Sequence, residues 1–188
     1  MSWVQWMRPG AAPNAKHEEL ISLLVQCHQS ATIANNNASS VALGLAASTG
    51  ASFWHSVAAA MMTFGDIHGP VTATRKAIYQ TSPESLRERI EDGEIIPGWG
   101  NSFFKHGLDP SWTRMDHLIR SEYTGHHEEI ERVGKAIFKS KGRILYPNAS
   151  AYTAVVAEII GLDHGTEPIL AIAARLPAWG AQYLGAQP

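Results

Sequence analysis

The sequence predicts an all-α fold in which a smaller helical lobe is inserted into a larger helical core. Apolar side chains recur at helical spacing, as in Leu20, Leu23, Leu24 and Cys27, which follow an i, i+3, i+4, i+7 pattern. Candidate helices begin after Ser, Asn or Pro, and several end at Gly, as helices commonly do. No segment shows the clear apolar–polar alternation of a half-buried strand, and no fixed-period repeat is present.

The N-terminal third of the chain predicts an arm and three helices. Residues 1–15 hold two Pro, a Gly and the pair Trp3 and Trp6, which predicts an irregular N-terminal arm. An amphipathic helix over 17–28 is followed by a polar loop, in which Asn37 or Ser39 would cap the next helix.

The two segments that follow, 40–50 and 52–65, are the most apolar of the chain and are rich in Ala, Gly and Ser. Small residues let helix backbones approach closely, so we expect both helices to pack against other helices or against a second subunit. A monomer of this length would expose part of them. This is the sequence argument for a homodimer or a higher homo-oligomer.

Pro, Ser and Gly residues mark the boundaries of the remaining predicted helices and of a long loop. Pro70 opens one helix, and Ser82 caps another that begins with Pro at its first position. A long loop starts at residue 94, and two charged helices follow it over 111–123 and 126–139. Apolar helices within 144–161 and 168–185 close the chain, and Pro177 is a candidate bend in the second.

The distribution of charge predicts the lobes. Segment 70–150 is more polar and charged than both flanks, which share a composition of small and apolar residues. We therefore expect residues 16–69 and 151–188 to form a helical, dimer-forming core, and residues 70–150 to form the small lobe. Ligand clefts occur preferentially at such junctions.

Composition argues against several classes of function. The 188 residues carry 15 Lys and Arg against 17 Asp and Glu, so no basic face for nucleic acid or an anionic membrane is indicated. No apolar run reaches the roughly 18 residues of a membrane-spanning helix. The single cysteine, Cys27, forms no intrachain disulfide, which favours a reducing compartment, and we expect a cytoplasmic protein.

Three patterns are candidates for chemistry. His68, in "GDIHGP", follows a predicted helix end and is either a general acid or base or a cap of the helix carbonyls. The segment "PGWG", residues 97–100, either presents backbone groups and an aromatic face to a ring such as adenine, or is a turn anchored by a buried Trp. His127 and Glu131 share a helix face, but two ligands do not make a zinc site, and we expect no metal.

Four segments, in this order, resemble motifs of the citrate synthase superfamily, including its citryl-CoA lyase-type members. They are "NNNASSVALGLAASTGASFWHSVAAAMMTFGDIHGP", "IIPGWGNSFFKHGLDPSW", "LYPNASAYTAVV" and "LAIAARLPAWGAQYL". The resemblance covers roughly residues 20–185. It implies an all-α fold in which a large domain forms the dimer and a small domain closes over coenzyme A. It also implies that this chain is a minimal version of the family's fold, which lacks most of the large domain's N-terminal part and the C-terminal tail.

The resemblance assigns site residues one by one. His68 matches the histidine that stabilises the enol of the acetyl-CoA moiety. Arg175 matches an arginine that binds a carboxylate of oxaloacetate or citrate, for which a guanidinium is well suited. Lys105 matches a basic residue of the loop that binds the coenzyme. The residues that match the loop whose backbone recognises the CoA adenine are Pro97, Gly98, Trp99 and Gly100.

The chain departs from the family pattern at several functional positions. Asn101 replaces the histidine that polarises the oxaloacetate carbonyl, Ser150 replaces the aspartate that acts as general base, and Ser111 replaces an arginine. The family's first histidine falls at His28 or at Ala34, and we prefer His28. Asn101 can donate a hydrogen bond but cannot pass on a proton, and a serine without an activating partner cannot replace a carboxylate.

Two functions are therefore expected. The first is an enzyme that acts on or binds coenzyme A thioesters, by acetyl-CoA and oxaloacetate condensation or by citryl-CoA cleavage, with impaired or altered catalysis. The alternative is a non-catalytic structural or interaction protein built on the same helical dimer. The replaced groups favour the alternative, whereas the retained histidine, loop and arginine favour the enzyme, and the sequence leaves both open.

Overall fold

The structure is a computed structural model that describes residues 3–7, 10, 12, 14–34 and 37–187. Within these ranges all regular secondary structure is helical, and an isolated antiparallel bridge between Trp99 and Pro147 is the one strand-like pairing. The all-α prediction is confirmed. The helices are α1 (Trp3–Met7), α2 (Ala15–Ala34), α3 (Ala38–Ser48), α4 (Phe53–Met61), α5 (Val71–Tyr79), α6 (Pro83–Glu91), the 3-10 helix η1 (Pro110–Trp112), α7 (Thr113–Glu122), α8 (Thr124–Lys141), α9 (Ala149–Ile159) and α10 (Pro168–Ala186).

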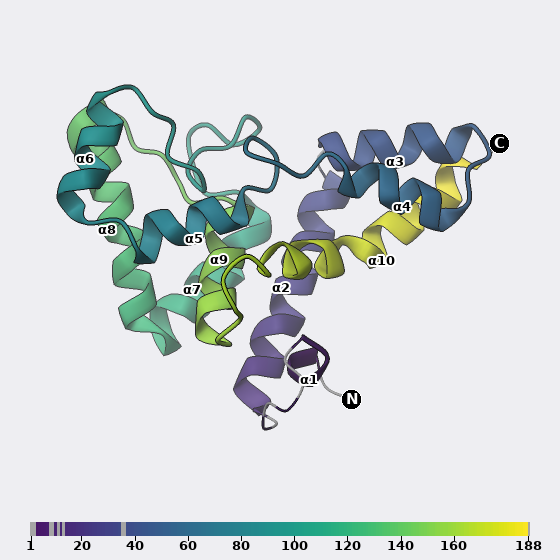
Figure 1. Cartoon of the computed structure of the whole chain (residues 1–188), viewed down its shortest axis with the longest axis horizontal. Helices are drawn as coiled ribbons and strands as arrows, with labels where there is room; N and C mark the ends of the chain where they lie inside the picture. The colour runs from purple at the N-terminus through teal and green to yellow at the C-terminus, as the bar shows by residue number, and fades with distance from the viewer. Residues whose placement is uncertain (1–2, 8–9, 11, 13, 35–36, 188) are drawn as a thin grey trace.

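The helices form two groups that are joined by α2, α9 and α10 (Figure 1). Helices α3 and α4 pack against each other and against α10 at one end of the molecule, while α5 to α8 lie at the other end. Helix α2 crosses between the groups and packs along α10 and α9, although these segments are far apart in sequence. The predicted lobe boundaries stay a prediction. In the part of the chain that is described, no helix has both the length and the apolarity needed to cross a membrane.

Helix starts follow the local signals in the sequence. The side chain of Asn37 accepts a hydrogen bond from the Ser40 backbone N–H and caps α3, so Asn37, not Ser39, is the cap. Ser82 caps α6, as predicted, and Asn148 caps α9 by accepting from the backbone N–H of Ser150. Each cap satisfies a backbone donor that has no partner within the helix.

The sequence interpretation is wrong for two N-terminal segments. Residues 29–34, predicted as loop, extend α2, because α10 covers this end and Gln182 donates to the Thr32 carbonyl. Part of the arm predicted as irregular forms α1, because Val4 is buried and its backbone N–H donates to Glu18. Pro177, the candidate bend, lies inside α10, which is a single helix over Pro168–Ala186.

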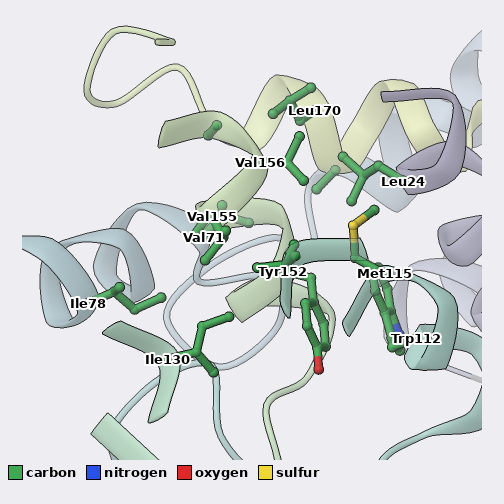
Figure 2. Packing of buried hydrophobic residues seen from close by; sticks show 14 of the residues in the cluster. Leu24, Val71, Ile78, Trp112, Met115, Ile130, Tyr152, Val155, Val156 and Leu170 are labelled. Atoms are coloured by element: carbon green, nitrogen blue, oxygen red, sulfur yellow. The ribbon is translucent and has the colours of Figure 1, made fainter. Parts of the chain in front are cut away.

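The main core surrounds α9, whose residues 150–157 are all buried (Figure 2). The ring of Tyr152 stacks on Trp112 with centroids 5.4 Å apart, beside Met115. Leu43, Val57, Ala60 and Trp179 form a smaller cluster where α3, α4 and α10 meet.

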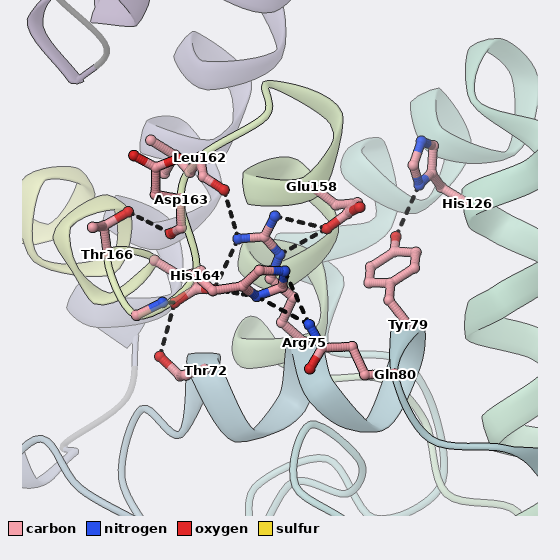
Figure 3. Close-up of polar contacts among 12 residues, drawn as sticks. Thr72, Arg75, Tyr79, Gln80, His126, Glu158, Leu162, Asp163, His164 and Thr166 are labelled. Atoms are coloured by element: carbon pink, nitrogen blue, oxygen red, sulfur yellow. Dashed lines mark hydrogen bonds and ion pairs between the residues drawn. The ribbon is translucent and has the colours of Figure 1, made fainter.

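A buried ion-pair network connects α5 to α9 and α10 (Figure 3). The Arg75 guanidinium lies 2.7 Å from a carboxylate oxygen of Glu158 and 2.8 Å from one of Glu167, and it also donates to the Leu162 carbonyl. Thr72 donates a further hydrogen bond to Glu167. Because every charge in this network has a partner, it fixes the position of α5, which leads away from the site described below.

Candidate functional site

A cavity of about 600 Å³ lies where α2, α9 and α10 meet the loops 65–70 and 95–103. This volume is in the range of small-molecule sites. The predicted site residues that line it are His28, His68, Pro97, Gly98, Trp99, Gly100, Asn101, Ser150 and Arg175. Lys105 does not line this cavity. It lines a neighbouring hollow, which shares Gly100 and Asn101 with the cavity.

His68 is held by a tight turn between α4 and α5. The backbone N–H of Gly65 donates to the His68 carbonyl over 2.8 Å, and the His68 ring packs edge-on against Phe64. Gly69 has a φ of +72°, and a Cβ there would lie 2.5 Å from the Phe64 ring, so the turn requires glycine. Met62 occupies the C-terminal cap position of α4, and Nε2 of His68 donates to no helix carbonyl among the described residues.

The His68 imidazole is neutral at pH 7. Burial, with a smaller contribution from the positive charge of Arg175, lowers its pKa to about 4. Its Nε2 atom is buried and has no hydrogen-bond partner in the described structure. Buried polar atoms normally have a partner, so this atom is a candidate contact for a ligand.

Arg175 provides the positive charge of the cavity. Its guanidinium carbon lies 4.9 Å from the centroid of the Phe64 ring, and its Nε and Nη1 atoms are buried without a partner among the described residues. Burial lowers its pKa to about 10, so it remains protonated at pH 7. A fixed guanidinium with unused donors matches the geometry of a carboxylate.

His28 is buried on α2 and has a defined tautomer. The hydroxyl of Thr153 donates to the Ala149 carbonyl over 2.7 Å, so it accepts from Nε2–H of His28 over 2.9 Å. Nδ1 of His28 therefore keeps its lone pair. Burial, and then Arg175, lowers the pKa of His28 well below its ordinary value. The side chain of Ala34, the other candidate for this role, lies outside the described part of the chain.

The "PGWG" loop is fixed against the start of α9. The backbone N–H of Gly100 donates to the Tyr146 carbonyl over 2.8 Å, and the backbone N–H of Asn148 donates to the Gly98 carbonyl over 2.9 Å. Gly98 has a φ of +92°, and a Cβ there would lie 2.4 Å from Cγ2 of Thr74. Trp99 is 5% exposed and belongs to the core, so the anchored-turn alternative holds for its side chain.

Two side chains connect this loop to its surroundings. The Asn148 side-chain amide donates to the Gly100 carbonyl over 2.9 Å, while its oxygen accepts from the backbone N–H of Ser150. The Asn101 side-chain oxygen accepts from the backbone N–H of Phe103. Its amide nitrogen lies 3.5 Å from Oδ2 of Asp109. The loop, Asn101 and Ser150 therefore form one wall of the cavity.

Sequence reasoning missed Asp109 and Thr153. Asp109 lines the cavity, is 4% exposed, and caps η1 by accepting from the backbone N–H of Ser111. The available signal was an Asp directly before Pro, a common helix-start pattern. Thr153 had no such signal, because its contact with His28 joins residues 125 positions apart.

The neighbouring hollow, of about 670 Å³, has a basic lining. Lys105, His106 and Arg143 contribute to it, and none of its described lining residues is acidic. Elsewhere, Nδ1 of His127 lies 3.8 Å from Oε1 of Glu131. The described ranges contain no group of three or more His, Cys, Asp or Glu side chains placed to hold a metal ion.

A family model for the citrate synthase C-terminal domain matches residues 2–187. The structure of citryl-CoA lyase from Hydrogenobacter thermophilus is similar, with a TM-score of 0.81 and 23% identity over 99% of this chain and 76% of that chain. Citrate synthase from Thermotoga maritima has a TM-score of 0.74 and 20% identity, over 96% of this chain and 51% of that chain.

A third similar structure is ATP citrate lyase from Methanothrix soehngenii in complex with citrate and coenzyme A. Its TM-score is 0.68 and its identity 16%, over 92% of this chain and 32% of that chain. This chain therefore spans about half of the citrate synthase and a third of the ATP citrate lyase. At these identities the structural likeness establishes the fold. No curated protein matches the sequence.

Proposed function

Because this chain belongs to the citrate synthase family, we propose that its cavity binds a coenzyme A thioester and catalyses formation or cleavage of the carbon–carbon bond beside the thioester carbonyl. The reaction is of the acetyl-CoA and oxaloacetate condensation or citryl-CoA cleavage type. One observation carries the proposal: His68 and Arg175 both contact Phe64, and both have buried nitrogen atoms without a partner in the described structure.

His68 stabilises the oxygen of the enol or enolate. With Nε2 in its protonated tautomer, the neutral imidazole donates a hydrogen bond to the thioester oxygen as negative charge develops there. The pKa of about 4 supports this role, because the ring remains neutral throughout the physiological pH range.

Arg175 binds the carboxylate of the second substrate. Its positive charge is buried and has no acidic partner among the described residues, so a bound carboxylate would satisfy both the charge and the free donors. His28, with Nε2–H occupied by Thr153, offers Nδ1 as an acceptor to a hydroxyl group of that substrate.

The coenzyme is bound by the loop 97–100 and the basic hollow beside it. The backbone groups of this loop that are not used in its own hydrogen bonds would contact the adenine, and Lys105 and Arg143 would neutralise phosphate groups. The ATP citrate lyase of similar fold was solved with citrate and coenzyme A, which supports this class of ligand.

A second candidate function is a non-catalytic protein on the same scaffold. The observation that favours it is that Asn101 and Ser150 line the cavity at the positions where the family has proton-transferring groups. General acid or base groups each contribute roughly 10²–10⁴-fold to rate. We therefore expect turnover below that of relatives that retain both groups.

We also propose a homodimer or larger homo-oligomer that buries one face of α3, α4 and α10. These helices and the residue after α4 expose Leu45 at 67%, Trp54 at 69% and Met62 at 86%, together with Leu184. Exposed large apolar side chains on neighbouring helices are typical of interaction sites. The small residues of α3 and α4 allow close approach of a second pair of helices.

We place the protein in the reducing cytoplasm. Its single cysteine, Cys27, is buried in the main core and forms no disulfide. Burial raises the pKa of this thiol to about 11, so it is unreactive.

Calorimetric titration with CoA and acetyl-CoA, followed by a thiol-release assay with oxaloacetate, tests the proposed function. We expect acetyl-CoA binding and slow release of thiol, which His68→Ala abolishes and His117→Ala, on the exposed surface of α7, does not. Absence of CoA binding at millimolar ligand would contradict the proposal. Binding without thiol release would favour the non-catalytic function.

A further inference from the structure

The cavity has acidic side chains that could serve as a base. Removing a proton from the carbon beside a thioester carbonyl requires a base, and Ser150 supplies none. Two of the described residues that line the cavity are acidic, Asp66 and Asp109. Asp66 is exposed on the 65–70 loop, whereas Asp109 is buried next to Asn101.

The two oxygen atoms of Asp109 have different environments. Oδ1 accepts from the backbone N–H of Ser111 over 2.9 Å, which fixes the carboxylate at the start of η1. Oδ2 has one contact in the described structure, with the Asn101 amide at 3.5 Å, which is the upper limit of a hydrogen bond. A carboxylate oxygen accepts two or more hydrogen bonds, so Oδ2 has unused capacity.

We infer that Asp109 is the general base of this cavity, in place of the carboxylate that is absent at Ser150. The inference rests on the proposed function. Oδ2 takes a proton from the methyl carbon of the bound acetyl thioester, and the C–H electron pair forms the C=C bond of the enolate. The π electrons of the thioester carbonyl move to its oxygen, where His68 donates a hydrogen bond. In D₂O the protonated Asp109 exchanges with solvent and returns a deuteron to the carbon.

A purely structural role for Asp109 would be the helix cap, and one substitution separates the two roles. Asp109→Asn keeps the oxygen that accepts from Ser111, because Asn is as good an N-cap as Asp, but it removes the base. The experiment measures deuteration of the acetyl-CoA methyl group in D₂O by mass spectrometry. Acetyl-CoA affinity is measured in parallel by calorimetry.

We expect the wild type to exchange and Asp109→Asn to lose at least about 100-fold in exchange rate, with acetyl-CoA affinity unchanged. Ser150→Asp in the Asp109→Asn background should restore exchange, because it places a carboxylate on the same cavity wall. This rescue cannot come from a cap. It also shows that the double variant is folded, even if Asp109→Asn alone is less stable.

Three outcomes would overturn the inference. They are an Asp109→Asn variant that exchanges within twofold of wild type, loss of exchange in Asp66→Asn instead, and a wild type that binds acetyl-CoA without any exchange. Failure of the wild type to bind acetyl-CoA at all contradicts the proposed function itself, so the two failures are distinguishable.

Discussion

The guanidinium of Arg175 lies over the ring of Phe64, 4.9 Å from its centroid. The same ring contacts His68 edge-on, with centroids 5.2 Å apart, so Phe64 positions two polar groups that come from opposite halves of the chain. A cation over an aromatic face is stabilised by the ring without using any of its N–H donors. Arg175 can therefore be buried while its donors stay available to a ligand.

Arg175→Gln tests this arrangement. We expect the KM for oxaloacetate to rise about 10- to 100-fold, because a charge-assisted hydrogen bond to the carboxylate is lost. The free energy of unfolding without ligand should not fall, since the substitution removes a buried charge that has no acidic partner among the described residues. Steady-state kinetics and urea unfolding measure the two effects. Arg87→Gln, on the surface of α6, is the control for loss of a positive charge.

The buried histidines predict how stability depends on pH. Folding lowers the pKa of His68 to about 4 and that of His28 well below its ordinary value, so below about pH 6.5 the unfolded chain binds more protons than the folded protein. The free energy of unfolding should therefore fall as pH drops from about 7 to about 5, which urea unfolding at each pH measures. His68→Gln should reduce this dependence, whereas His117→Gln should leave it unchanged. If the free energy of unfolding depended equally on pH in both variants, His68 would not be a source of this dependence.

Gly98→Ala tests the loop at residues 97–100. The new Cβ would meet Cγ2 of Thr74, so we expect loss of CoA binding in calorimetric titration. Gly93→Ala is a matched control, because Gly93 has a similar φ of +88° but no atom near the new Cβ. Thr74→Ser removes the clashing methyl group and should partly restore binding to Gly98→Ala. Equal effects of the two alanine substitutions would show that backbone strain, not the clash, is responsible.

The Arg75 network predicts a large effect on stability. Arg75→Met leaves Glu158 and the buried Glu167 without their partner and should lower the free energy of unfolding by about 3–5 kcal/mol. Lys135→Gln breaks an exposed ion pair with Glu131 and should cost at most about 0.5 kcal/mol. Urea unfolding measures both variants. If Arg75→Met lowered the free energy of unfolding by less than Lys135→Gln does, this would contradict a structural role for the network.

The exposed face of α3 and α4 predicts the oligomeric state. The double variant Leu45→Ser, Trp54→Ser should sediment as a monomer at concentrations where the wild type sediments as a dimer or larger species. Phe138→Ser removes an exposed aromatic side chain from α8, at the other end of the molecule, and should not change the oligomeric state. A wild type that sediments as a monomer would contradict the proposed homo-oligomer.

Features determined by a few neighbouring residues could be predicted from the sequence. A helix cap depends on one side chain and the next turn of helix. The structure confirms the predicted cap at Ser82, and of the two candidates Asn37 and Ser39 it shows Asn37 as the cap of α3. The apolar spacing from Leu20 to Cys27 likewise identifies a buried helix face. The motif resemblance identified site residues such as His68 and Arg175, which the structure brings together in one cavity.

Features that depend on distant contacts could not be predicted. The last turns of α2 have a polar sequence, and they are helical because α10 packs on them. The positions of Phe64 between the polar groups and of Asp109 beside Asn101 depend on how the loops pack. Trp99 was ambiguous for the same reason, since only the packed structure decides whether an aromatic side chain is an anchor or a contact surface.

The hydrogen bonds of Asn148 have a consequence for how such proteins diverge. This side chain binds the carbonyl of Gly100 and the backbone N–H of Ser150, and neither bond uses the side chain at position 150. A lineage can therefore exchange the group at that position, and with it the reaction, while the shape of the loop is inherited unchanged.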